Sequence, residues 1–101
     1  MIEAAEAAIG FLAGRARSDL DDDRMLFLAT IKAIEIIGEA ASRLSASTRE
    51  NSPDIPWGDI IGMRNRLTHV YFDVNSDIVW QSTTEELPEL LSKLRALLGE
   101  P

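Results

Sequence analysis

Apolar side chains recur along this chain at the three- and four-residue intervals typical of amphipathic α-helices. Four segments show this pattern, and no strand is predicted. The predicted helices span about 2–16, 24–45, 57–68 and 77–98. The acidic run at 18–23 reads as a turn. Residues 47–56 read as a polar loop in which Pro56 is well placed to open the third helix.

On the second predicted helix, polar side chains occupy only a narrow arc. This arc consists of Lys32, Glu35, Glu39, Ser42 and Arg43. A surface helix needs an apolar stripe a little over ~100° wide, and the apolar positions here cover about twice that. We therefore expect this helix to be central in the molecule and to pack partly on a second chain.

The last predicted helix contains an internal proline, Pro88. Proline has no backbone N–H, and its ring collides with the carbonyl four residues earlier in a helix. The helix is therefore predicted to be kinked or split near this position.

Length and composition indicate one soluble domain spanning residues 1–101, with 46% apolar and 27% charged residues. The formal charge of −7 should repel nucleic acid and acidic membranes, so any contact with RNA must be local. The absence of cysteine excludes disulfides and thiolate metal sites. No long apolar run and no signal peptide are visible, so no membrane association and a cytoplasmic location are expected.

One short stretch, "MRNRLTHVYFDV" at 63–74, gathers side chains suited to chemistry on phosphate. It holds Arg64, Arg66, Tyr71 and the only histidine, His69, and residues 60–72 contain no acid. On a straight helix, positions five apart are about 140° apart around the axis. Arg64 and His69 can therefore converge only if the helix ends near Thr68, or if two copies meet across a dimer axis.

A histidine can take and give a proton at neutral pH, and an arginine can stabilise the negative charge of a phosphate transition state. Together they are the minimal parts for attack by an RNA 2′-hydroxyl on the neighbouring phosphate. No metal is needed, because the nucleophile belongs to the substrate. A two-fold dimer would bring two histidines and two arginines to one groove, offering both a base and an acid.

Each of these side chains also has a plainer interpretation. A lone histidine near a helix end is often a capping or packing residue. The two arginines could be solvated or paired with Asp59 and Asp73, and Tyr71 could be a half-buried aromatic. Spacing alone does not decide between the two interpretations.

The constellation Arg64-x4-His69-x-Tyr71 resembles the R-x4-H-x-Y signature of HepT-like toxins, within the HEPN superfamily of helical ribonucleases. The segments "EIIGEAA" (35–41), "IPWGDIIGMRNRLTHVYFDVN" (55–75) and "IVWQSTTEELPELLSKL" (78–94) are similar to the second, third and fourth helices of that family. The resemblance implies an all-α, four-helix up-and-down bundle that forms a homodimer. The motifs of both chains would line a shared cleft.

The resemblance also implies roles for individual residues. Arg64 and His69 would be the catalytic pair of a metal-independent endoribonuclease toxin that needs no cofactor. Asn65 would orient His69 or the phosphate, and Arg66 would support phosphate binding. Tyr71 would receive AMP from an MntA-like nucleotidyltransferase antitoxin, as in type VII-like toxin–antitoxin systems, and the added bulk and charge would block the cleft.

The roles of two further residues of the second predicted helix follow from their positions. Glu39 would either order Arg64 or pair in solvent with Arg43, four residues further on. Gly38 is best interpreted as a close-packing point between helices.

Two other functions compete with the enzyme. The chain could be a non-catalytic nucleotide-binding or scaffold partner of a nucleotidyltransferase, in which Arg64 and Arg66 hold a phosphate and His69 only hydrogen-bonds it. It could also be a purely structural helical dimer.

Overall fold

Helices account for every regular element in the computed structural model, which describes residues 1–69, 76–97 and 99 and the side chains of these except 66–69. The elements are α1 (Ile2–Leu12), α2 (Asp19–Asp22), α3 (Arg24–Arg43), α4 (Ala46–Glu50), α5 (Trp57–His69), α6 (Ser76–Gln81), the π-helix η1 (Ser82–Glu86) and α7 (Leu87–Leu97). The predicted all-α class is confirmed for these residues. The four-helix up-and-down topology and the homodimer stay predictions.

One predicted helix end and two predicted connections were wrong. The first helix ends at Leu12 and not near residue 16, because Ala13 is extended and Gly14 has a φ of +73°, a left-handed conformation that glycine adopts without strain. The 18–23 turn contains one helical turn, α2. The predicted loop likewise begins with α4, whose N-cap Ser45 accepts a hydrogen bond from the Thr48 N–H at 3.1 Å.

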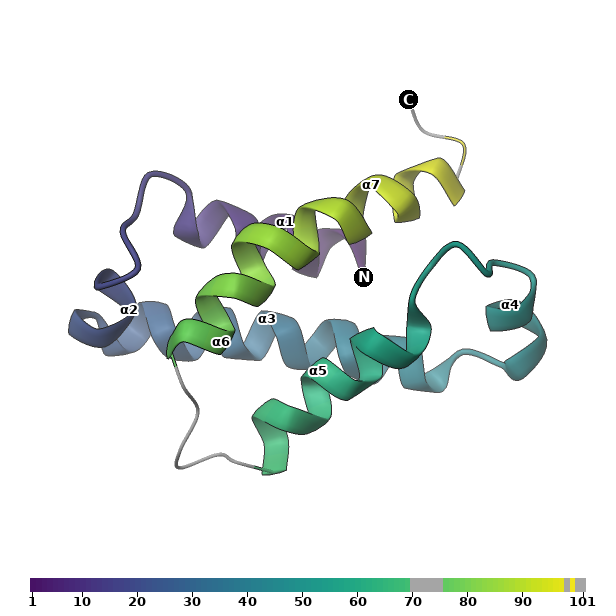
Figure 1. The fold of residues 1–101 in the computed structure, drawn as a ribbon, viewed down its shortest axis with the longest axis horizontal. Helices are drawn as coiled ribbons and strands as arrows, with labels where there is room; N and C mark the ends of the chain where they lie inside the picture. Colours follow the sequence, from purple (N-terminus) through teal and green to yellow (C-terminus); the bar gives the residue numbers. More distant parts are fainter. Residues whose placement is uncertain (70–75, 98, 100–101) are drawn as a thin grey trace.

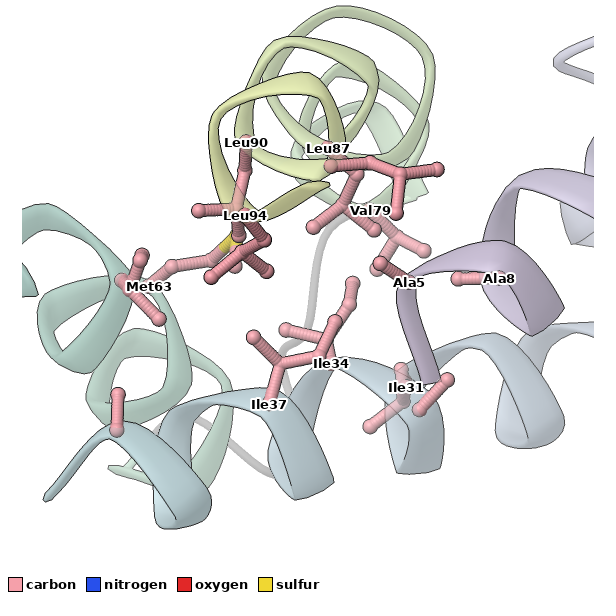
Figure 2. Packing of buried hydrophobic residues seen from close by; sticks show 14 of the residues in the cluster. Ala5, Ala8, Ile31, Ile34, Ile37, Met63, Val79, Leu87, Leu90 and Leu94 are labelled. Carbon is pink, nitrogen blue, oxygen red and sulfur yellow. The ribbon is translucent and has the colours of Figure 1, made fainter. Parts of the chain in front are cut away.

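The central position of the second predicted helix is confirmed. α3 runs along the whole molecule and packs against α1, α2, α5 and α6 (Figure 1). It begins at the N-cap Asp23, whose Oδ1 accepts from the Leu26 N–H at 3.1 Å. Its inward side chains, including the fully buried Ile34 and Ile37, lie opposite side chains of α1, α5, α6 and α7. Figure 2 shows Ala5, Ala8, Met63, Val79, Leu87, Leu90 and Leu94 converging on this interior.

The outward stripe of α3 is partly apolar. Met25 is 78% exposed, Leu28 41% and Ile36 46%, and they share this stripe with Lys32 and Glu39. Most of the apolar residues of this helix are therefore buried or partly buried because the helix is central in the molecule. Packing of the remainder on a second chain stays a prediction.

The last helix is split near Pro88, one of the two outcomes that the proline predicted, and a kink there stays a prediction. The helix changes from α to π geometry at 82–86, and Pro88 is the second residue of α7. The Leu87 N–H donates to the carbonyl of Ser82, five residues earlier, which is the π pattern. The wider turn lies where the proline removes a donor, so the helix is divided without a break in the chain direction (Figure 1).

Within the described ranges, none of the helices combines the length and the apolar character needed to cross a membrane.

Candidate functional site

The helix that carries the arginine–histidine motif is anchored at its start by a tryptophan. Pro56 precedes α5, and Trp57, its first residue, is buried. The indole Nε1–H of Trp57 donates to the carbonyls of Arg49 (3.2 Å) and Ser52 (3.1 Å). These bonds tie the start of α5 to the segment that follows α3, so the direction of α5 is set before the chain reaches Arg64.

One turn past the middle of α3, α5 comes into very close contact with it. A Cβ placed on Gly38 would lie 2.1 Å from Cβ of Arg64, 2.6 Å from its Cγ and 3.5 Å from its Cα. Gly38 is buried, and the stem of Arg64 lies directly on its backbone. The interpretation of Gly38 as a close-packing point is therefore confirmed, and the residue packed on it is the candidate catalytic arginine.

The head of Arg64 is held from its own helix. Its guanidinium donates from Nη1 to Oδ1 of Asn65 at 2.9 Å, and both side chains are half-buried. The sequence predicted that Asn65 would orient His69 or the phosphate. The structure shows it as a partner of Arg64, a role that the spacing did not indicate.

Glu39 lies one residue after Gly38 but points to solvent. Its Oε1 accepts from Arg43 Nη2 at 2.7 Å, four residues further along α3. This is the solvent-exposed pair that the sequence offered as the alternative to ordering Arg64, and the alternative is the one observed. A supporting role of Glu39 at the site stays a prediction.

The remaining motif residues are described less fully. α5 includes positions 66 and 69, but the side chains of Arg66 and His69 lie outside the described part, and so does all of Tyr71. The helix ends at His69, within one residue of the predicted end near Thr68. Backbone positions 64 and 69 are about 140° apart around the helix axis, and convergence of the two side chains stays a prediction.

A polar network that the sequence did not predict lies at the start of α6, directly after residues 70–75. Ser76 Oγ donates to Asp21 Oδ1 at 2.8 Å, and Arg17 bridges the carboxylates of Asp21 and Asp77. The hydrogen bonds from Ser76 and Arg17 lower the pKa of the Asp21 carboxyl below its ordinary value of 3.8. Asp21 of α2 thereby holds the start of α6, the helix that follows the segment containing Tyr71.

The groove between α5 and the last helix is unsuited to phosphate. A groove of about 610 Å³ separates α5 from α7, and its charged lining residues are Asp59, Glu86, Glu89 and Lys93. Carboxylates outnumber ammonium groups there, so the groove should repel a polyanion. Among the residues whose side chains the structure describes, no three His, Asp or Glu side chains gather to hold a metal ion.

The described residues define a class: an all-helical protein in which a half-buried arginine, packed on a glycine of the central helix, precedes a histidine on the same helix. Comparison with known proteins narrows this class. Residues 1–97 match the family described as Ribonuclease HepT-like. The chain belongs to the HepT-like ribonuclease family.

Similar proteins occur in bacteria and archaea. A protein of Caldanaerobacter subterraneus subsp. tengcongensis named "Putative RNase TTE0752" is 36% identical over 98 residues, which are 97% of this chain and 88% of that protein. "Putative RNase MJ1380" of Methanocaldococcus jannaschii is 32% identical over 90 residues, 89% of this chain and 83% of that protein. "Probable ribonuclease HepT" of Thermococcus cleftensis is 36% identical over 75 residues, 74% of this chain and 68% of that protein. No solved structure matches this chain.

Proposed function

We propose that this protein is a metal-independent endoribonuclease toxin with Arg64 and His69 as its catalytic residues. The observation that carries the proposal is the fixed position of Arg64, whose stem lies on Gly38 and whose guanidinium is bound by Asn65. Membership of the HepT-like family and the R-x4-H-x-Y spacing support it.

The proposed reaction is transfer of the RNA phosphate to the 2′-hydroxyl. His69 removes the proton of the 2′-hydroxyl, a bond forms between the 2′-oxygen and phosphorus, and the bond from phosphorus to the 5′-oxygen breaks. The leaving 5′-oxygen takes a proton from a protonated histidine, and the products are a 2′,3′-cyclic phosphate and a 5′-hydroxyl. Arg64 stabilises the negative charge on the phosphate oxygens during this exchange.

A homodimer is part of the proposal. Positions 64 and 69 of one α5 are about 140° apart around its axis, so a second copy is the simpler source of a histidine for each arginine. A two-fold axis would also supply two histidines, one as base and one as acid. The exposed Met25, Leu28 and Ile36 of α3 are apolar surface that a partner chain could cover.

Control by a nucleotidyltransferase antitoxin completes the proposal. An MntA-like partner would transfer AMP from ATP to the Tyr71 hydroxyl and release pyrophosphate. The new phosphodiester would place a negative charge beside a site that binds phosphate, and so inhibit it by repulsion and by bulk.

The test is cleavage of a mixed RNA pool by purified, unmodified protein in excess chelator. Wild type is compared with Arg64→Ala, His69→Ala and Arg15→Ala, an exposed arginine of the α1–α2 connection that controls for loss of positive charge. We expect 2′,3′-cyclic phosphate ends from wild type and Arg15→Ala only.

Intact RNA after incubation with folded, dimeric, unmodified wild type would contradict the ribonuclease proposal. If that protein bound nucleotide equally well with and without His69, the scaffold or nucleotide-binding function would take its place. Growth arrest on expression, relieved by His69→Ala, is the corresponding measurement in cells.

A further inference from the structure

We propose that Gly38 is a positioning residue for Arg64: its missing side chain is the space in which the arginine stem lies, and the site depends on that space. The inference rests on the proposed ribonuclease function and extends it to a residue of another helix that touches no substrate.

The contact at Gly38 is specific to this glycine. The chain has six glycines, and a Cβ placed on Gly10, Gly14, Gly58, Gly62 or Gly99 would meet no atom within 4 Å. At Gly38 the nearest atoms all belong to Arg64. Gly38 lies in a helix and does not have a left-handed backbone conformation. A glycine is therefore needed at this position for space and not for its backbone conformation.

The atoms in contact decide how a substitution would act. A flexible side chain can rotate its far end away from a new methyl group, but the Cβ of Arg64 is fixed by the backbone of α5. Relief of a 2.1 Å contact to the ordinary distance of at least 3.4 Å therefore requires α5 to move from α3 by about 1.3 Å. A displacement of about 1 Å in a catalytic group can lower a rate by roughly 10²-fold.

Two contacts of Arg64 with described residues contribute to its position. Gly38 fixes where the arginine stem leaves α5, and Asn65 Oδ1 fixes the guanidinium at 2.9 Å. An arginine side chain has several rotatable bonds. If its conformation is restricted before substrate binds, less conformational entropy is lost when the substrate binds.

The first experiment compares cleavage of one defined RNA oligonucleotide, in chelator, by wild type, Gly38→Ala and Gly10→Ala. Gly10 is a helical glycine of α1 with open space around it, so Gly10→Ala is the matched control. Because Arg64 acts on the transition state, we expect Gly38→Ala to lower kcat by about 10- to 100-fold with KM changed by less than about threefold. The pH dependence of kcat/KM should keep its shape, since His69 is retained. Gly10→Ala should match wild type.

The second experiment asks whether Gly38 acts through Arg64. Arg64→Gly removes both the guanidinium and the Cβ that a methyl at position 38 would meet. The readout is thermal unfolding, because variants of Arg64 are expected to be inactive. In this background, Gly38→Ala should no longer lower the unfolding temperature. If Gly38→Ala alone fails to fold, the double variant should fold, because the colliding atoms are gone.

The outcomes separate the two proposals. Active wild type with Gly38→Ala equal to Gly10→Ala would overturn the role of Gly38 and leave the ribonuclease function standing. A fall in unfolding temperature from Gly38→Ala that is undiminished in the Arg64→Gly background would also overturn it. Folded wild type that cleaves no RNA would overturn both.

Discussion

Arg64 and Asn65 are consecutive residues of α5 joined by a side-chain hydrogen bond, from Nη1 of the arginine to Oδ1 of the asparagine at 2.9 Å. Neighbouring positions on a helix point about 100° apart, so short side chains there do not meet. The long arginine side chain reaches around the helix to the amide. The hydrogen bond to Asn65 therefore helps to set the direction in which the guanidinium points.

The first prediction concerns this bond. Asn65→Ala removes this acceptor, so the guanidinium would lose one of its contacts and sample more conformations in the free protein. We expect kcat/KM for RNA cleavage to fall about fivefold, in line with the loss of one hydrogen bond of roughly 1 kcal/mol. Asn65→Asp should lower it further, because a carboxylate at this position would neutralise the charge that binds phosphate. Equal rates for all three proteins would show that Asn65 does not orient Arg64.

The second prediction concerns the sharing of residues between two copies. Arg64→Ala and His69→Ala are each expected to be inactive as homodimers. Mixing and exchanging the two variants should restore cleavage to roughly tenfold or more above either parent, if arginine and histidine come from different chains. The restored rate should stay below that of wild type, because the mixed dimer keeps one of the two histidines. A self-contained site in each chain gives no recovery, since every chain then lacks one of its two residues. Native mass spectrometry of two variants that differ in mass through an affinity tag establishes that mixed dimers form.

The sequence predicted those parts of the fold that depend on local patterns. The apolar periodicity located α3 and α5, and Pro56 marked the start of α5 within one residue. The short helices α2 and α4 were missed because a single turn has too few residues to show a period. The π segment was missed as such, although Pro88 indicated that the helix would be interrupted there.

At the candidate site, the sequence predicted a contact only where a residue type has one common structural role. A glycine inside a helix indicated close packing, and the structure adds that Arg64 is the residue packed there. The network that joins Arg17 to Asp77 spans 60 positions along the chain, and no spacing rule connects such distant charges. Surface charges of this kind have many possible partners until the fold is known.

The third prediction uses that network. The pKa of Asp21 is lowered by hydrogen bonds from Ser76 and Arg17, so the folded state favours the ionised carboxyl. Its stabilising contribution is present at pH values above its ordinary pKa of 3.8 and is lost as the pH falls through the lower, folded-state value. Wild type should therefore unfold at a higher temperature than Asp21→Asn at about pH 6, and the difference should shrink toward about pH 3.

Asp22→Asn, one residue further along the same exposed turn, controls for the general effect of removing a negative charge from this acidic protein. Ser76→Ala should reproduce part of the Asp21→Asn effect, because the serine supplies the largest of the interactions that lower this pKa. A difference between wild type and Asp21→Asn that stays constant from about pH 6 to pH 3 would contradict the assignment.

The fourth prediction concerns two buried threonines that differ in one respect. Thr30 is fully buried and its hydroxyl donates to the Leu26 carbonyl at 2.8 Å. The hydroxyl of Thr83, 1% exposed in the π turn, has no hydrogen-bond partner in the part of the chain that the structure describes. A buried polar group without a partner costs about 1–3 kcal/mol of folding free energy. Valine has nearly the same shape as threonine and needs no partner, so Thr83→Val should stabilise the protein by about 1 kcal/mol and raise Tm by roughly 4–8 °C.

Thr30→Val is the matched comparison, since it makes the same chemical change at an equally buried site where a hydrogen bond is lost. It should leave Tm unchanged or lower it by a few degrees. Thermal unfolding of the two variants beside wild type measures both effects, and RNA cleavage should be unaltered because neither threonine lies in the α5 motif. A lower Tm for Thr83→Val would mean that the Thr83 hydroxyl is satisfied in solution, by a water molecule bound within the π turn.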